Sequence, residues 1–302
     1  MKKKIVVIGS CNTDMVISMD HLPLPGETLI GGEFFMNSGG KGANQAVAAA
    51  RLGGKISFIA KVGNDPFGKR ALEQYRAEGI DVKHILTDPE HPSGVALIMV
   101  DRQGENSIAV ASGANAQLTS EDVDKANELL QHAEIVLMQL EPPLATVEHA
   151  AYVAKKAGAK VILNPAPAQP LPESLLQNLH ILIANETEAE FISGIQITDM
   201  DSVARAADIL CNKGIEKVVI TLGSRGAFVK EMGYYHQIPG LKVKAIDATA
   251  AGDTFCGALS VALAEGKSLT EAVTFANRCA AVTVTRMGAQ SSLPHRNEIE
   301  EA

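Results

Sequence analysis

The part of the sequence that points most clearly to chemistry is DATAAGDTF, at residues 247–255. Small residues crowd the positions before Asp253, and the apolar spacing of a helix begins directly after it. Small side chains at Ala250, Ala251 and Gly252 would leave the amides of a helix N-terminus uncovered, and such amides favour negative charge. They would stabilise a phosphoryl group in transfer, with Asp253 as the general base for the attacking hydroxyl. The alternative, an acid placed only for the helix dipole, explains Asp253 but not the small residues before it.

A second candidate is the glycine-rich segment SGGKGANQA, at residues 38–46. It is not a Walker A phosphate loop, because Lys41 is followed by Gly42 rather than Ser or Thr, and Phe35 stands where the first Gly belongs. The Rossmann fingerprint also fails, since the chain reads GSCNTD after the first apolar run. The glycines would let the backbone approach a ligand, with Lys41 and Asn44 able to bond hydroxyls. The alternative is a tight helix start.

Several polar residues follow directly after apolar runs. Asn12 and Asp14 come after the first run, and Glu141 closes IVLMQLE before two prolines. Taken alone, Asn12 and Asp14 are typical of a turn. In a doubly wound sheet, however, ligands bind outside the carboxyl ends of the strands, where Asn185 and Gly223 also fall. Polar residues that converge on one edge of a sheet suit a polyhydroxy substrate.

The segment NETEAE places Asn185 and Glu188 three residues apart at a helix start. A capping box accounts for this spacing without any function. The functional interpretation is that Glu188 holds a water-bearing Mg²⁺ near phosphates, because Mg²⁺ keeps several waters and takes few carboxylates. The segment TLGSRGA places Thr221 and two glycines directly after a strand, where they would line a nucleotide-binding site.

Composition limits the class of protein. The 302 residues are 46% hydrophobic and carry a formal net charge of -8, which argues against a nucleic-acid or membrane partner. The four cysteines show no metal or redox spacing, so we expect reduced thiols. The start MKKKIVVIGS has too short an apolar run for a signal peptide, and no run is long enough to span a membrane. These features predict a cytoplasmic protein.

Apolar runs rich in Val and Ile alternate with amphipathic helical patterns. Such runs are typical of strands buried on both faces, and their alternation with helices predicts right-handed βαβ units. We therefore expect an α/β fold with a three-layer, doubly wound, mostly parallel sheet. The expected strands are 4–9, 56–63, 134–140, 160–165, 180–185 and 217–223, and the expected helices 42–54, 67–79, 120–133 and 202–214.

Two segments break this alternation. Residues 27–37 and 93–113 have an antiparallel pattern, the second with a turn at DRQGEN, and neither is followed by a helix that could cover it. We expect a small projecting β-sheet, which is either a lid or an interface. With no linker or internal repeat, residues 1–302 should form a single domain, and the lid should comprise roughly 14–38 and 93–113.

Taken together, these motifs resemble the phosphofructokinase-B type of carbohydrate kinases, in particular the ribokinases. The resemblance covers essentially the whole chain in order, through GGKGANQAVAAARLG, NPAPA, NETEAE, DATAAGDTFCGAL and TRMGAQSSLP. It implies a three-layer α/β body with a β-sheet lid, and a homodimer formed through two lids. The implied activity is ATP-dependent transfer of phosphate to the 5-hydroxyl of D-ribose, with Mg²⁺ and K⁺ as cofactors.

The resemblance also implies a role for each matching position. Asp253 would be the base, and the amides of 250–252 the anion hole. The ribose hydroxyls would be bound by Asn12, Asp14, Gly40, Lys41, Asn44 and Glu141. The ATP site would be lined by Asn185, Thr221, Gly223, Gly226, Gly252 and Asn277, with Glu188 organising Mg²⁺. A potassium ion would be held by Asp247, Thr249, Thr283, Arg286, Gly288 and Ser292, several of them through backbone carbonyls.

Two other functions remain open at this stage. The first is the same chemistry on another small sugar, above all 2-deoxyribose. The second is a non-catalytic sugar or nucleotide sensor on the same fold, although such a sensor would be expected to lack Asp253. Two positions also depart from the family pattern, since Ala248 stands where Thr is common and Asn277 where His is common.

Overall fold

A nine-stranded sheet forms the centre of the protein in the computed structural model, which describes residues 3–300. Its order is β13-β12-β11-β10-β9-β8-β1-β4-β5. Strands β12 and β13 run antiparallel to their neighbours, and the others are parallel. The strands are β1 (Lys4–Ile8), β4 (Lys55–Gly63), β5 (Ile85–Asp88), β8 (Ile135–Met138), β9 (Lys160–Leu163), β10 (Ile181–Asn185), β11 (Lys217–Thr221), β12 (Ala227–Glu231) and β13 (Tyr234–Ile238).

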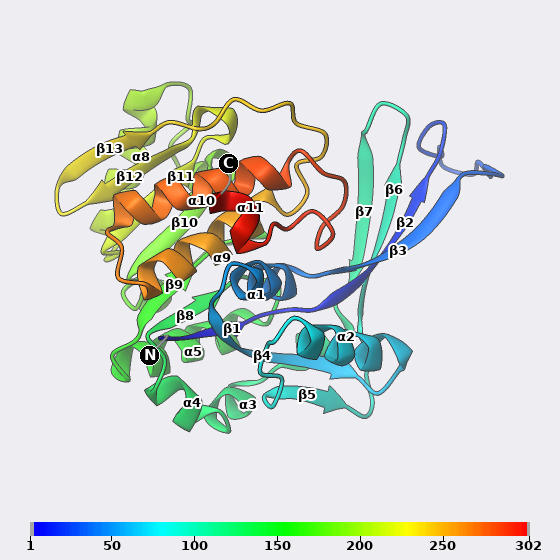
Figure 1. The fold of residues 1–302 in the computed structure, drawn as a ribbon, viewed down its shortest axis with the longest axis horizontal. Coiled ribbons are helices and arrows are strands. Elements are labelled where there is room, and N and C mark those ends of the chain that lie inside the picture. The colour runs from blue at the N-terminus through cyan, green and yellow to red at the C-terminus, as the bar shows by residue number, and fades with distance from the viewer. Residues whose placement is uncertain (1–2, 301–302) are drawn as a thin grey trace.

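Helices cover both faces of this sheet (Figure 1). Alternate side chains of one strand enter different cores: Ile5 and Val7 of β1 face one, and Val6 and Ile8 the other. The first core is closed by α1 (Lys41–Arg51), α2 (Pro66–Ala77), α9 (Ala251–Ala264), α10 (Leu269–Thr283) and α11 (Arg296–Glu300). The second is closed by α3 (Ser120–Asp124), α4 (Asn127–Gln131), α5 (Leu144–Lys156), α6 (Glu173–Leu176), α7 (Glu186–Ser193) and α8 (Met200–Asn212). The predicted three-layer fold is confirmed.

Some elements differ from the sequence prediction. The six expected parallel strands are present, but the helix expected over 120–133 is broken into α3 and α4. The amide of Ala126 donates to the carbonyl of Val123 (2.9 Å), a tighter bond than an α-helix makes, and this interrupts the helix. Strands β5, β12 and β13 were not predicted. None of the helices within residues 3–300 has the length and apolar character needed to cross a membrane.

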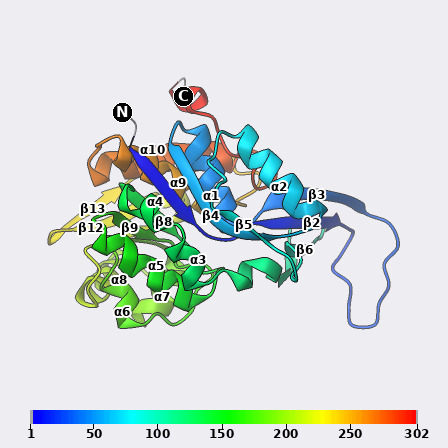
Figure 2. The same cartoon turned by 90° about the horizontal axis from the view of Figure 1, so that it is seen from below.

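A separate four-stranded sheet, in the order β3-β2-β6-β7, stands to one side of the main body (Figures 1 and 2). It contains β2 (Asn12–Ser18), β3 (Glu33–Gly39), β6 (Gly94–Val100) and β7 (Asn106–Ala111). The predicted projecting sheet and its hairpin are thus present, although β3 begins only at Glu33. The turn considered at Asn12 and Asp14 is wrong: both lie in β2, where pairing with β3 and β6 extends the backbone.

Candidate active site

Asp253 lies in the first turn of α9 and is buried, with an exposed fraction of 7%. Each carboxylate oxygen accepts a hydrogen bond from a side-chain amide of α1. The Nδ2 of Asn44 donates to Oδ2 (2.9 Å), and the Nε2 of Gln45 donates to Oδ1 (3.0 Å). A carboxylate with one bond on each oxygen keeps lone pairs free for a further donor. Asp253 is therefore fixed in place and still able to accept a proton.

The start of α9 exposes backbone amides. The amide of Ala251 donates to the carbonyl of Ala248 (3.2 Å), and that of Thr254 donates to the carbonyl of Ala250 (2.8 Å). No described residue accepts from the amides of Gly252 and Asp253 between them. Ala250 adopts the left-handed conformation, with φ at 60°, which is uncommon for a residue with a side chain. This arrangement leaves an N-terminus suited to an anion.

Two cavities meet at this helix N-terminus, and Thr221, Ala248 and Gly252 line both. The smaller, of ≈ 210 Å³, is rich in charged and amide groups: Lys41, Asn164, Asn185, Glu188 and Asp253 line it. The larger, of ≈ 440 Å³, is mostly apolar, and its lining includes Gly223, Gly226, Leu241, Val243, Phe255, Asn277, Ala280 and Val284. The two linings suit a ligand with an apolar end and a charged end.

Polar groups from three elements gather around Lys41 beside Asp253. Glu141 follows β8, and its Oε2 accepts from the backbone amide of Lys41 (2.9 Å) and from the hydroxyl of Ser10, which follows β1. The chain leaves β1 towards β4 on one side of the sheet and returns through β8 on the other. The bond between Ser10 and Glu141 thus spans the point where the strand order reverses, the usual ligand position in such sheets.

The charges of this group perturb one another. Burial raises the pKa of Asp14 to about 7, and the negative charges of Glu141 and Asp253 act in the same direction. Burial alone would lower the pKa of Lys41, but the carboxylates of Asp253, Glu141 and Glu188 outweigh it and raise that pKa. Lys41 therefore carries its charge at neutral pH among several acids. Such perturbed groups in a cavity are typical of functional sites.

The glycines of residues 39–42 serve the packing of the backbone. A Cβ at Gly40 would lie 2.7 Å from the backbone N of Asn12, and one at Gly42 would lie 2.6 Å from that of Ser10. Gly40 also has φ at 87°. These two glycines are therefore needed for packing, since they let α1 start against the chain that joins β1 to β2; the expected approach of their backbone to a ligand stays a prediction.

Asn12 lies near this group, on the same face of β2 as Asp14 because the two residues are two positions apart. Its Oδ1 accepts from Nδ2 of Asn115 (2.7 Å), which fixes the orientation of the Asn12 amide. Asn115 is itself fixed by the backbone N and O of Cys11. The NH₂ group of Asn12 is thereby held in a defined direction.

The capping box predicted at Asn185 is present. The Oδ1 of Asn185 accepts from the amide of Glu188 (2.8 Å), and Oε2 of Glu188 accepts from the amide of Asn185 (3.0 Å). Glu188 also lines the polar cavity, and burial raises its pKa. The two interpretations of this residue are thus compatible. The carboxylates of Glu188 and Asp253 line this cavity, and so few carboxylates fit Mg²⁺ held mainly through waters and phosphates. Residues 3–300 contain no group of three or more His, Cys, Asp or Glu side chains that could hold a metal ion.

The residues expected at the ATP site lie in both cavities. Thr221, Gly223, Gly226, Gly252 and Asn277 line the apolar one, and Asn185 lines the polar one. The Nδ2 of Asn277 on α10 donates to the carbonyl of Pro239 (3.3 Å). Gly226, with φ at 92°, must remain glycine, because a Cβ there would meet the backbone of Gly240 at 2.3 Å.

The residues expected at the potassium site come together only in part. The carboxylate of Asp247 accepts from the amides of Thr249 and Gly288, each at 2.8 Å, and so joins two loops. The hydroxyls of Thr283 and Ser292 and the guanidinium of Arg286 are bonded elsewhere, to Cys279, Ala289 and Glu298. Their side chains are thus engaged, which fits a site that would use backbone carbonyls with Asp247 nearby.

Four amide residues of the site were not predicted: Gln45, Gln139, Asn164 and Gln290. All are buried, and their side chains bond to one another or to Asp253 or Asn44. Gln139 stands in the apolar run IVLMQL, and Gln45 in the apolar pattern of α1. An amide residue within an apolar run could have indicated these positions, because a buried amide needs a hydrogen-bond partner in the core.

Comparison with known proteins agrees with this geometry. Residues 2–296 match the model of the pfkB family of carbohydrate kinases. The ribokinase of Haemophilus influenzae is 49% identical over 301 residues, covering 100% of this chain and 98% of the relative. A deoxyribokinase of Salmonella typhi is 37% identical over 298 residues, covering 98% of this chain and 97% of the relative.

A solved structure of Arabidopsis thaliana ribokinase, complexed with ribose and ATP, is also similar. It has a TM-score of 0.94 and 33% sequence identity, and the match covers 100% of this chain and 98% of that one. The match of fold and sequence over the full length shows that the chain belongs to the pfkB family of carbohydrate kinases.

Proposed function

We propose that this chain is a kinase that transfers the γ-phosphate of ATP to the 5-hydroxyl of D-ribose. The observation that carries the proposal is the position of Asp253. It lies at the open N-terminus of α9, where the polar and the apolar cavity meet, and both its oxygens are held by amides. Relatives named ribokinase at up to 49% identity support the substrate.

In this proposal the sugar lies beside Lys41, over the start of α1. Its hydroxyls are bound by Asn12, Asp14, Gly40, Lys41, Asn44 and Glu141. Asp253 accepts the proton of the 5-hydroxyl as that oxygen attacks. Of the amides expected to form the anion hole, over 250–252, that of Ala251 bonds to the carbonyl of Ala248. In this proposal the free amides of Gly252 and Asp253 stabilise the charge of the phosphoryl group in transfer.

ATP occupies the other half of the site. The apolar cavity suits the adenine ring, with Asn277 and Gly223 at its wall, and the polar cavity suits the phosphates. Glu188 is the residue that would hold Mg²⁺ there, through water rather than by direct ligation. The ion would supply positive charge to offset the negative charge of the phosphates. Lys41 lines the polar cavity and carries its positive charge among acids, so it is placed to bind the sugar and the phosphates in this proposal.

A second candidate substrate is 2-deoxyribose, because a deoxyribokinase is among the relatives at 37% identity. Asn12 favours ribose. Its amide is buried and fixed by Asn115, so without a hydroxyl to bond it would lose a partner, at about 1–3 kcal/mol.

The test is an assay of purified protein with ATP and Mg²⁺ against pentoses, hexoses and nucleosides. We expect the highest kcat/KM with ribose, and we expect Asn12→Met to narrow or invert the preference over 2-deoxyribose, mainly by weakening ribose. Equal use of the two sugars by the wild type would remove Asn12 as the discriminator. Absence of turnover with every sugar would favour the sensor on a kinase fold.

We also propose that the four-stranded sheet is a lid that pairs with that of a second copy. Its strands carry exposed apolar side chains, among them Phe34, Phe35, Leu97, Ile108 and Val110. By strand register, Phe34 and Leu97 share one face, and Phe35, Ile108 and Val110 the other. An uncovered apolar sheet of this kind usually marks an interface.

A cytoplasmic location completes the proposal. All four cysteines are free thiols, as expected in a reducing compartment. Three of them are buried, and burial raises their pKa values, so they are unreactive side chains of the core rather than redox groups. ATP as the phosphate donor is consistent with the same compartment.

A further inference from the structure

The two amides that hold Asp253 work in one orientation only. The side chain of Asn or Gln has an oxygen that accepts and a nitrogen that donates, and rotation by 180° exchanges them. Asn44 and Gln45 both present NH₂ to the carboxylate. The reversed amides would place oxygen against oxygen and repel the charged carboxylate. The orientation of these two amides therefore matters for the base.

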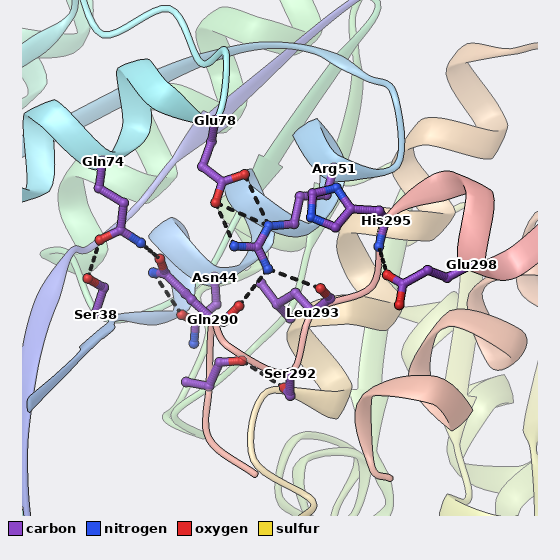
Figure 3. A network of polar contacts seen from close by, with 11 residues as sticks. Ser38, Asn44, Arg51, Gln74, Glu78, Gln290, Ser292, Leu293, His295 and Glu298 are labelled. Carbon is purple, nitrogen blue, oxygen red and sulfur yellow. Dashed lines mark hydrogen bonds and ion pairs between the residues drawn. The ribbon is translucent and has the colours of Figure 1, made fainter. Parts of the chain in front are cut away.

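Asn44 is oriented by Gln290, which lies in the loop after α10. The Nε2 of Gln290 donates to Oδ1 of Asn44 (3.2 Å), so the NH₂ of Asn44 must face Asp253. The chain continues outward, since Nε2 of Gln74 donates to Oε1 of Gln290 (2.7 Å) and the hydroxyl of Ser38 donates to Oε1 of Gln74. Figure 3 shows Ser38, Gln74, Gln290 and Asn44 in this order. Every bond runs in the same direction.

Gln45 is oriented in the same way by Gln139. The Nε2 of Gln139 donates to Oε1 of Gln45 (2.6 Å), which leaves the NH₂ of Gln45 for Asp253 and for Oδ1 of Asn164 (3.2 Å). The Oε1 of Gln139 itself is buried and has no hydrogen-bond partner among residues 3–300. An unpaired buried oxygen raises the free energy of the folded state. The bond from Gln139 to Gln45 is therefore made at some cost in stability.

The side chains of Gln45, Gln139 and Gln290 are buried, and the backbone of Gln290 is anchored. Gln45 and Gln139 have exposed fractions of 0%, and Gln290 has 3%, so water does not replace a lost partner. The backbone of Gln290 is held by Arg51, whose Nη1 donates to the carbonyls of Gln290 (2.7 Å) and Leu293 (3.0 Å). Glu78 in turn binds the guanidinium of Arg51 at 2.6 Å (Figure 3).

We propose that Gln290 and Gln139 are positioning residues for the carboxylate of Asp253, each fixing the orientation of one of the two amides that bind it. Neither contacts Asp253 directly. Gln290 acts through Asn44, and Gln139 acts through Gln45. The inference rests on the proposed kinase function. It assigns a role in positioning the base to one residue of the loop after α10 and to one that directly follows β8.

The test is a pair of double-mutant cycles on the full-length enzyme, with phosphorylation of ribose as the readout. The first compares Gln290→Met, Asn44→Leu and the double variant, and the second Gln139→Met, Gln45→Leu and their double. Met is close to Gln in size but makes no such bond. We expect each Met variant to lower kcat roughly ten- to a hundredfold with little change in the KM for ATP. Each double variant should be no slower than its Leu single variant, because the second residue acts only through the first.

A pH profile separates positioning from a general structural effect. Loss of an oriented donor disfavours the charged carboxylate, so the acid limb of kcat/KM for ribose should move to higher pH in Gln290→Met and Gln139→Met. The titratable groups that face Asp253 are Lys41 on α1, Asp14 on β2, Glu188 on α7 and Cys256 on α9, and none is altered in these variants. A destabilised but correctly positioned enzyme would keep the wild-type profile.

The outcomes are distinguishable. Gln131→Met, at the exposed end of α4, is the control and should leave kcat unchanged. Multiplicative losses in both double variants, or wild-type pH profiles, would overturn the positioning role. A wild type without kinase activity would instead count against the proposed function. If one Met variant does not fold, the other cycle decides, because the two pairs act on different oxygens of Asp253.

Discussion

Gly252 gives a test at the scale of single residues. Apart from its chain neighbours and the backbone of α9, a Cβ at this position would have no atom within 4 Å, so a side chain there would extend into the space where the two cavities meet. Alanine also stabilises a helix relative to glycine by roughly 1 kcal/mol. We therefore expect Gly252→Ala to retain or raise the melting temperature while kcat falls, and Gly252→Val to lower kcat further. Wild-type turnover in Gly252→Val would exclude the start of α9 as the phosphoryl site.

Asp14 predicts a dependence of stability on pH. Its pKa is about 7 in the folded protein against the ordinary value of 3.8 for an aspartate, so between these values the folded state holds the extra proton. The free energy of unfolding without ligand should therefore fall as pH rises from about 4 to 7, by an amount on the order of 4 kcal/mol at most. Asp14→Asn cannot titrate and should lose this decline, so its stability relative to wild type should rise with pH.

Urea unfolding at several pH values measures this difference. The matched control is Asp20→Asn. Asp20 follows the strand that contains Asp14 and pairs with Arg102, but its side chain is 71% exposed. Asp20→Asn should follow the wild-type pH dependence. A constant stability difference between Asp14→Asn and wild type from pH 4 to 8 would show that Asp14 titrates normally.

The sequence identified the residues that sit in local motifs, but not those whose partners are distant. Asp253 and the pair of Asn185 and Glu188 stand in short patterns whose meaning is local. The bond between Gln290 and Asn44, in contrast, joins residues 246 apart, and that between Gln45 and Asp253 joins residues 208 apart. Such partners follow from how α1, α9 and the last loop pack, which a pattern along the chain does not contain.

At the scale of elements, the loop around Asp247 and Gly288 carries the next prediction. Asp247 lies in the segment that leads into α9, and its carboxylate accepts from the amide of Thr249 in the same segment. It also accepts from the amide of Gly288, in the loop after α10, and so joins the two segments. A monovalent cation held there would fix the start of α9. Replacing sodium by potassium at constant ionic strength should raise kcat, and Asp247→Asn should abolish the difference between the two salts. Equal rates of the wild type in both salts would rule out the site.

The elements themselves were predictable where their pattern is strong. The six parallel strands are apolar on both faces and alternate with helices, so their existence and type followed from the sequence. Strand β13 (Tyr234–Ile238) is mostly exposed, with a polar pattern, and β5 (Ile85–Asp88) is short, so neither produced a clear signal. Strand β2 begins with Asn12, a residue that favours turns, and pairing with β3 and β6 overrides that preference.

At the scale of the whole molecule, the uncovered four-stranded sheet predicts a dimer. Ile108 and Leu97 lie on opposite faces of this sheet, with exposed fractions of 55% and 54%. We expect the wild type to sediment as a dimer at micromolar concentration, and Ile108→Asp or Leu97→Asp to yield monomers. Met232→Asp, on the exposed turn between β12 and β13, is the control and should remain dimeric. A monomeric wild type would contradict the proposed interface.

The central claim is that Asp253 is the general base of the proposed reaction, held by the two amide chains that end at its carboxylate. The most direct measurement is the steady-state rate of ribose phosphorylation by Asp253→Asn, with binding of ribose and ATP measured in parallel by calorimetry. Asn keeps the size of the side chain but cannot accept the proton. We predict that kcat falls by roughly 10²–10⁴ while both dissociation constants change little. A variant that turns over at near the wild-type rate would contradict the account.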